Sequence, residues 1–144
     1  MYNFLLLRRS PNNLSSLPLF YALSESSHLD SQTDEFLLHH YSFLLSSSSR
    51  HHGGTAILIR YDASYTSILA DLPSFAFRSS AAVLPVLLRI TSVVFLLVSI
   101  YLPPSAPKSD FDLLLSLLGS LVFKYRSIPI LICGDFNLKH PAWG

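Results

Sequence analysis

The sequence holds only one cysteine in 144 residues, so the chain cannot form an internal disulfide. That residue, Cys133, lies in an apolar run, where it is most simply a small core residue. Charge is also scarce: 13% of residues are charged and the formal net charge is +1. No basic field is large enough to argue for nucleic-acid binding by itself. The sequence is compatible with a reducing, intracellular compartment.

The first residues do not show the pattern of a signal peptide, and no continuous apolar run reaches membrane-spanning length. The apolar residues 1–7 precede Arg8 and Arg9, the reverse of the order in a signal peptide, so secretion is not expected. Half of the residues are hydrophobic, and the run 81–104 raises the question of a membrane span. Pro85 and Arg89 interrupt that run, and the uninterrupted remainder is shorter than the roughly twenty residues that a helical span needs. Two buried strands joined by a turn are therefore expected, with a small membrane protein as the alternative.

The chain alternates short β-rich runs with one helical pattern. Expected strands cover residues 20–25, 55–60, 84–90, 93–101 and 130–133, and the last is expected to be buried on both faces. Residues 31–49 are Ser-rich and predict a loop. The turn between the third and fourth strands, near Thr91 and Ser92, has neither Gly nor Asn and is a weak turn signal.

A helix is predicted over residues 111–124. Ser109 or Asp110 is expected to cap its first turn through a side-chain oxygen. Apolar residues at helical spacing predict one buried face, formed by Phe111, Leu114, Leu115, Leu118 and Val122. Strands and a helix with acids at strand ends describe layered α/β structure.

The most informative stretch is residues 130–144, where Gly134-Asp135-Phe136-Asn137 directly follows an apolar strand. A carboxylate and an amide at a strand exit can reach solvent, a divalent cation and a substrate phosphate. The alternative is structural, because Asp and Asn in this pattern also form a common turn by bonding their own backbone.

This motif, followed by His140-Pro-Ala-Trp-Gly144, resembles the endonuclease/exonuclease/phosphatase (DNase I-like) superfamily. The nearest likeness is to the endonuclease domain of non-LTR retrotransposons and their reverse-transcriptase polyproteins. The resemblance implies a four-layered fold of two mixed sheets with helices outside, of which residues 20–144 would supply a part. Residues 1–19 match poorly, and Asn3, the one candidate there for an active-site Asn, is not assigned.

The resemblance also implies roles for four residues. Glu25, after the strand that begins at Phe20, takes the place of the ligand of the catalytic Mg²⁺, with Mn²⁺ as an alternative ion. Asp135 and Asn137 take the place of residues at the phosphodiester-cleaving centre, and Tyr101 that of a tyrosine beside the scissile phosphate. Leu102 replaces a residue that is often Arg in the family, which removes a possible phosphate contact.

The expected activity is therefore metal-dependent cleavage of DNA. The family completes its site with a later Ser-Asp-His segment that these 144 residues do not contain, so we expect a truncated domain that is weakly active or inactive alone. The alternative is a non-catalytic remnant of a retroelement that keeps part of the fold. No stable protein partner can be inferred, and the nucleus and the cytoplasm are equally compatible.

Overall fold

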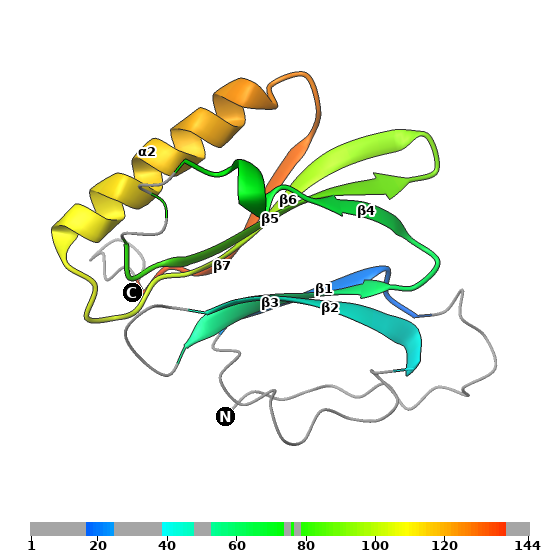
Figure 1. Cartoon of the computed structure of the whole chain (residues 1–144), viewed down its shortest axis with the longest axis horizontal. Coiled ribbons are helices and arrows are strands. Elements are labelled where there is room, and N and C mark those ends of the chain that lie inside the picture. Colours follow the sequence, from blue (N-terminus) through cyan, green and yellow to red (C-terminus); the bar gives the residue numbers. More distant parts are fainter. Residues whose placement is uncertain (1–16, 25–38, 48–52, 74–75, 77–78, 138–144) are drawn as a thin grey trace, which may run out of the picture.

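The part of the chain that the structure describes contains two β-sheets and one long helix (Figure 1). The computed structural model describes residues 17–24, 39–47, 53–73, 76 and 79–137. Sheet A contains β1 (Phe20–Ser24), β2 (Tyr41–Ser47) and β3 (Gly54–Arg60) in the order β1-β3-β2. Sheet B has the order β4-β5-β6-β7, with β4 at Ser64–Ser67, β5 at Ala82–Ile90, β6 at Val93–Tyr101 and β7 at Ile130–Asp135. A short 3₁₀ helix, η3 (Leu69–Asp71), follows β4.

The predicted hairpin is present as β5 and β6, which pair antiparallel along their whole lengths. The turn between them forms without Gly or Asn, because Thr91 itself adopts a positive φ of 52°. Pro85 lies inside β5, opposite Val98, and its carbonyl accepts a hydrogen bond from the amide of Ile68. The apolar run is therefore two strands of a sheet. Among the described residues, no helix is long and apolar enough to cross a membrane.

Sheet A is antiparallel throughout and contains one strand that was not predicted. The prediction of a loop over residues 31–49 is wrong for β2, which pairs with β3 from Tyr41 opposite Arg60 to Ser47 opposite Gly54. The serines conceal the strand because they interrupt the alternation of apolar and polar residues that indicates a strand. Tyr41 is 1% exposed and packs with Ala56 and Leu58 on the face of sheet A that points away from sheet B.

Helix α2 (Lys108–Lys124) covers the face of sheet B that points away from sheet A (Figure 1). The predicted cap is wrong: Pro107 occupies the N-cap without a side-chain bond, and Ser109 and Asp110 lie inside the helix. The carboxylate of Asp110 instead accepts bonds from the amide of Ser80, at 2.7 Å, and from its hydroxyl. This buried contact ties the start of the helix to the segment that enters β5.

The buried face of α2 is rotated relative to the prediction. Leu114, Leu117 and Leu121 are its buried apolar residues, whereas Leu115 and Val122 are 50% and 44% exposed. Phe111 and Leu118 flank the face and pack partly against the core. Leucine occupies so many successive positions that more than one stripe fits a period of 3.6 residues, and the sheet decides which stripe is buried.

Helix α2, sheet B and sheet A are stacked in this order, and an apolar cluster fills each of the two spaces between them. One lies between α2 and sheet B and includes Val83, Leu96, Val98 and Ile100. The other lies between the two sheets and is built from side chains of β3, β5 and β6, namely Ile57, Ile59, Leu84, Val86, Leu88 and Leu97. Alternate residues of β5 and β6 serve the two clusters, as the period of a strand requires. The predicted mixed α/β class is confirmed, although only sheet B is mixed.

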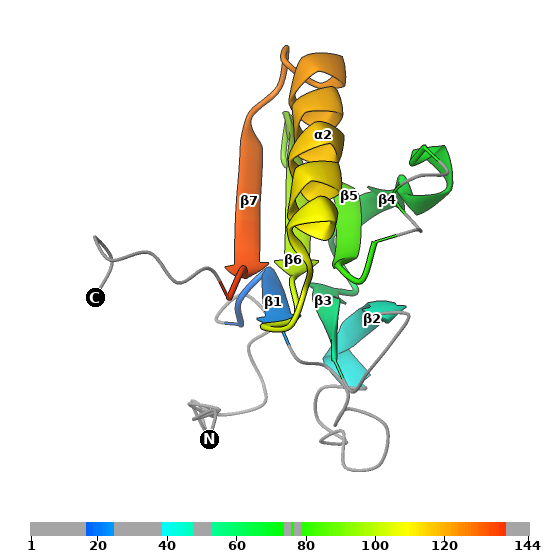
Figure 2. The ribbon, with the colours of Figure 1, turned by 90° about the vertical axis from the view of Figure 1, so that its left-hand side faces the viewer.

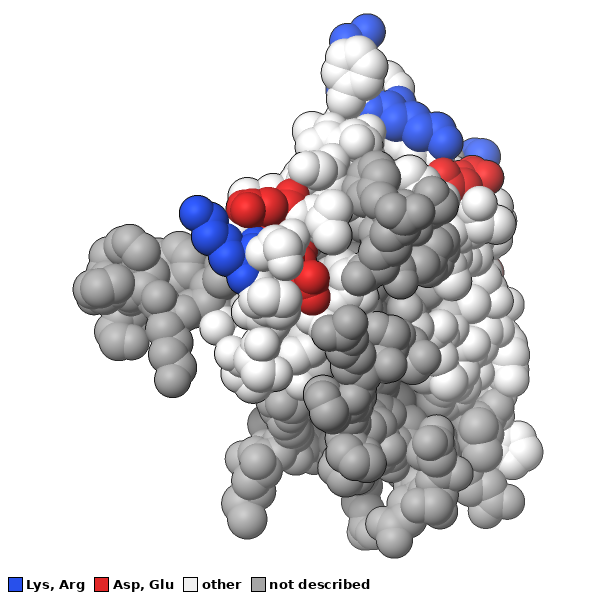
Figure 3. Space-filling view, turned by 60° about the vertical axis from the view of Figure 1, so that its left-hand side comes forward, with Lys and Arg blue, Asp and Glu red and all other residues white. Residues whose placement is uncertain are grey.

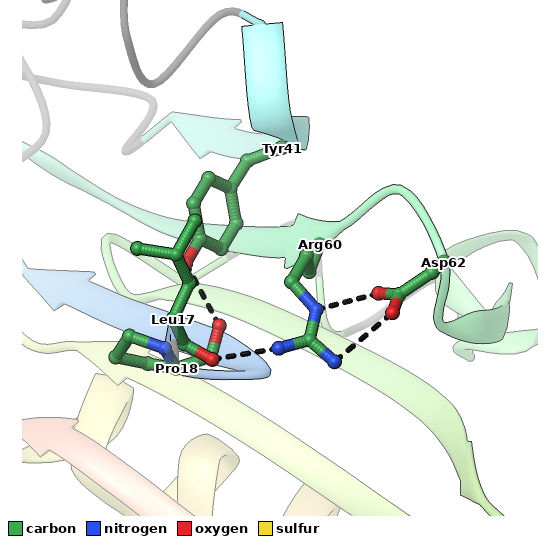
Figure 4. A network of polar contacts seen from close by, with 5 residues as sticks. All are labelled: Leu17, Pro18, Tyr41, Arg60 and Asp62. Atoms are coloured by element: carbon green, nitrogen blue, oxygen red, sulfur yellow. Dashed lines mark hydrogen bonds and ion pairs between the residues drawn. The ribbon is translucent and has the colours of Figure 1, made fainter. Parts of the chain in front are cut away.

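A polar network joins the end of β3 to the segment that enters β1 (Figure 4). The guanidinium of Arg60 forms two bonds with the carboxylate of Asp62, at 2.6 and 3.0 Å, and a third with the carbonyl of Leu17 at 2.7 Å. The Arg60 hydrogen bonds hold the pKa of Asp62 below its usual value. The hydroxyl of Tyr41 donates to the carbonyl of Pro18 at 2.8 Å, and burial raises the Tyr41 pKa. These bonds anchor the segment that enters β1.

Strand β7 pairs in parallel with β6 and forms an edge of sheet B. The prediction that residues 130–133 are buried on both faces is therefore wrong. Leu131 and Ile132 are 45% and 37% exposed, because β6 covers only one side of the strand. The helix α2 provides the crossover that a parallel pair needs.

Candidate active site

Three strands, β1, β6 and β7, end at the same end of the molecule. β6 and β7 are parallel, so both reach this end with their last residues (Figure 2). In the register of this pair, Tyr101 stands opposite Asp135. β1 also ends here, because its last residue, Ser24, pairs with Thr55 near the start of β3. Residues that are far apart in the sequence are thus brought to one edge, which is the place where layered α/β proteins commonly bind ligands.

Asp135 and Asn137 lie at the exit of β7 and are tied to the neighbouring backbone. The carboxylate Oδ1 of Asp135 accepts the amide hydrogen of Asn137 at 3.0 Å, which is the geometry of an Asx turn. The side-chain amide of Asn137 donates to the carbonyl of Leu102 at 2.9 Å, and its φ of 45° is in the left-handed region that Asn tolerates. The expected turn is therefore present, and the roles of these two residues at a catalytic centre stay predictions.

Tyr101 packs its ring on the backbone of Gly53, just before β3. A Cβ atom at Gly53 would lie 2.7 Å from Cζ and 2.8 Å from the hydroxyl of Tyr101, closer than real Cβ atoms approach. Gly53 thus creates the space that the ring occupies. Tyr101 itself is 5% exposed, so its ring is fixed by packing between the two sheets.

Gly134 allows β7 to reach this position. Its φ is +138°, and a Cβ atom there would lie 2.7 Å from the carbonyl carbon of Ile100 on β6. Only glycine combines this backbone conformation with so close an approach of two strands. The backbone geometry therefore requires the glycine of the motif, whatever the chemistry of the site.

A buried polar cluster that the sequence analysis missed lies just inside the site. Thr55 of β3 and Ser99 of β6 are both 0% exposed, and their hydroxyls bond to each other. Cys133 stands beside Ser99 in the register, its thiol lies 3.7 Å from the carbonyl of Val98, and burial raises its pKa. A serine inside the apolar run 93–101 is the signal that could have drawn attention to this cluster.

The structure brings together three of the four predicted site residues: Tyr101, Asp135 and Asn137. Glu25, the predicted metal ligand, lies outside the described residues, as do His140 and Trp143. Within the described ranges, no group of three His, Cys, Asp or Glu side chains could hold a metal ion. Asp135 and Asn137 offer the hard oxygen donors that Mg²⁺ prefers, and a second carboxylate such as Glu25 would be needed to hold the ion.

Charge at the surface is sparse. On the face shown in Figure 3, the Lys and Arg side chains lie in separate places and acidic side chains lie near them. This distribution agrees with the net charge of +1. This face therefore carries no broad basic field that would attract a polyanion over a long distance.

Two packed sheets, a crossover helix and polar residues at converging strand ends define a layered α/β protein with a candidate hydrolytic site. The chain belongs to the Endonuclease/Exonuclease/phosphatase family, whose sequence model matches residues 7–144. The predicted superfamily is therefore confirmed. Comparison with curated protein sequences finds no match.

Solved structures show the same fold. The catalytic domain of human Nocturnin, determined with a bound sulfate anion, superposes with a TM-score of 0.56 at 18% identity over 85% of this chain. Truncated TDP2 of Caenorhabditis elegans gives 0.53 at 15% identity, again over 85% of this chain. The chain spans about half of each of these structures, 52% and 50% of their lengths.

Proposed function

We propose that this chain is part of a divalent-metal-dependent phosphodiesterase domain that cleaves DNA, of the endonuclease type carried by non-LTR retrotransposons. The observation that carries the proposal is the meeting of Tyr101, Asp135 and Asn137 at the ends of two parallel strands in a chain of this family. The branch assignment rests on the sequence resemblance of residues 130–144.

Hydrolysis of a phosphodiester requires an activated water and stabilisation of the charge that develops on the phosphate oxygens. Asp135 lies at an open strand end, where its carboxylate would orient or deprotonate the attacking water. The Asn137 amide and the Tyr101 hydroxyl are hydrogen-bond donors of the kind that stabilises phosphate oxygens. Glu25 would hold Mg²⁺, or Mn²⁺, which when bound neutralises phosphate charge.

The local bonds of Asn137 set a condition on this mechanism. Its Nδ2 atom donates one of its two hydrogens to the carbonyl of Leu102. The second hydrogen is not part of that bond, and in the proposed mechanism it would be donated to a phosphate oxygen. The bond fixes the amide against the end of β6, beside Tyr101. An amide held in this way is preorganised, which is the arrangement that stabilises a developing charge without reorganisation.

A nicking assay on supercoiled plasmid tests the proposal. Under this proposal the truncated wild-type chain is expected to nick weakly with Mg²⁺ or Mn²⁺ and to stop when EDTA is added. Asp135→Asn is expected to slow nicking by about 10²-fold or more, because it removes the base but keeps the size of the side chain. Asp112→Asn, an exposed acid on α2, is the matched control and is expected to leave the rate unchanged. Equal rates for the wild type and Asp135→Asn would contradict the catalytic assignment.

The competing proposal is a non-catalytic remnant of a retroelement. The Asx turn favours it, because the hydrogen bonds of Asp135 and Asn137 already stabilise the turn, which gives both residues a structural role without catalysis. In that case Asp135→Asn changes stability but no activity is present to lose. The nucleotide sequence downstream separates the two. A Ser-Asp-His segment and polymerase motifs in the same reading frame support a retrotransposon endonuclease, and their absence favours the remnant.

A further inference from the structure

A pair of buried hydroxyls joins the two sheets directly beneath the candidate site. The Oγ1 atom of Thr55 donates to the carbonyl of Leu23 on β1 at 3.0 Å. Thr55 has a single hydroxyl hydrogen, so in its bond with Ser99 it is the acceptor and Ser99 is the donor. One short chain of bonds therefore runs from β6 through β3 to β1.

The position of this chain relative to the site follows from the strand registers. Thr55 stands opposite Ser24, the residue that directly precedes Glu25 in the sequence. Ser99 lies two residues before Tyr101 on β6, and its partner in β7 lies two residues before Asp135. The bridge thus connects the strand that leads to the predicted metal ligand with the two strands that carry the other site residues.

Packing alone does not require hydroxyls at this place. The rest of the layer between the sheets is apolar, with Ile57 and Leu97 among its fully buried members. Burying two hydroxyls costs free energy that their mutual bond only roughly offsets, whereas an apolar pair of the same shape carries no such cost. An apolar contact between sheets is also non-directional, but a hydrogen bond fixes the distance and the angle between two particular strands.

We propose that Thr55 and Ser99 are positioning residues that set the spacing between the two halves of the active site. In this proposal, which rests on the proposed function, the bridge holds the end of β1 at a fixed distance from Tyr101 and Asp135. Neither hydroxyl touches the substrate. Loss of the bridge would leave the protein folded but let the two sheets shift relative to each other at the site.

The first test measures the ring of Tyr101, which packs between the sheets on Gly53 and is sensitive to their spacing. NMR spectra of protein with ring-labelled tyrosine give its signals, which Tyr101→Phe assigns. Thr55→Val and Ser99→Ala are expected to shift these signals, whereas Thr55→Ser, which keeps the hydroxyl, is expected to restore the wild-type positions. Tyr41→Phe is the matched control, because it removes a buried hydroxyl at the opposite end of β3.

Single variants leave one buried hydroxyl without its partner and can lower stability for that reason. The double variant Thr55→Val/Ser99→Ala removes both hydroxyls, so neither is left without a partner. If a single variant does not fold, the Tyr101 signals are measured in this double variant. A Tyr101 ring that keeps its wild-type signals in the folded double variant would overturn the proposal.

The second test uses metal affinity, with Mn²⁺ titrated into each variant and its free fraction followed by electron paramagnetic resonance. The bridge variants are expected to bind Mn²⁺ at least about tenfold more weakly than the wild type, while Thr55→Ser and Tyr41→Phe bind as the wild type does. Equal affinity in the bridge variants would overturn the link to the metal site. A wild type that binds no Mn²⁺ counts against the proposed function instead, and the Tyr101 signals still decide the role of the bridge.

Discussion

Replacement of Gly134 by alanine tests the geometry on which the candidate site depends. The φ of +138° places Gly134 in a region that is open essentially to glycine, and a side chain there costs about 1–3 kcal/mol. The added Cβ also meets the backbone of Ile100, so β7 must move away from β6. Loss of two ladder bonds at this point would add about 2 kcal/mol.

The sum, about 3–5 kcal/mol, is a large part of the 5–15 kcal/mol that stabilises a typical domain. Urea unfolding followed by circular dichroism gives the free energy of unfolding of both proteins. Gly119→Ala is the matched control, because Gly119 is exposed inside α2 and nothing lies within 4 Å of the added Cβ. Alanine there is expected to stabilise the protein by about 0.5–1 kcal/mol. A Gly134→Ala protein as stable as the wild type, or equal losses in both variants, would refute this reasoning.

Four further predictions concern three side chains, Tyr41, Cys133 and Asp62. Tyr41→Phe is expected to cost about 1–2 kcal/mol in urea unfolding, because the Pro18 carbonyl loses its donor. Burial raises the Tyr41 pKa above the unfolded value of about 10, so stability is expected to fall as the pH rises above about 10, and less steeply in Tyr41→Phe. Burial also raises the pKa of Cys133, so alkylation by iodoacetamide is expected to reach half its maximal rate at a higher pH in the native protein than in urea. Asp62→Asn is expected to leave the urea midpoint almost unchanged, since the partner of Arg60 is exposed and the bond to the Leu17 carbonyl remains.

Strand and helix positions were predictable where one signal dominated. The apolar, β-branched runs of β3, β5 and β6 were found because few other structures suit such runs. β2 was missed because serines hide its alternation, and its pairing with β3 is a tertiary fact. The buried face of α2 was misplaced because leucine fills several stripes, and only the packing against sheet B selects one.

The candidate site was predictable in part, for a similar reason. Asp135 and Asn137 could be found because they lie two residues apart in one motif, and Tyr101 because prolines mark the end of its strand. The bond between Thr55 and Ser99 could not be found, since it depends on the distance between two sheets that no local pattern encodes. Gly53 and Gly134 are intermediate cases: the sequence shows a glycine, but only the structure shows which atoms require it.

The parallel pairing of β7 with β6 has a consequence for the order in which the protein folds. Two residues connect β5 to β6, whereas the whole of α2 lies between β6 and β7 in the sequence. The pairing of β7 with β6 therefore closes a much longer loop. Contacts between residues distant in sequence form late, because the loop entropy is lost before they are made. Asp135 would then reach Tyr101 in one of the last steps. An edge strand that docks late is also expected to detach early, so amide hydrogens of β7 should exchange with solvent before those of β5.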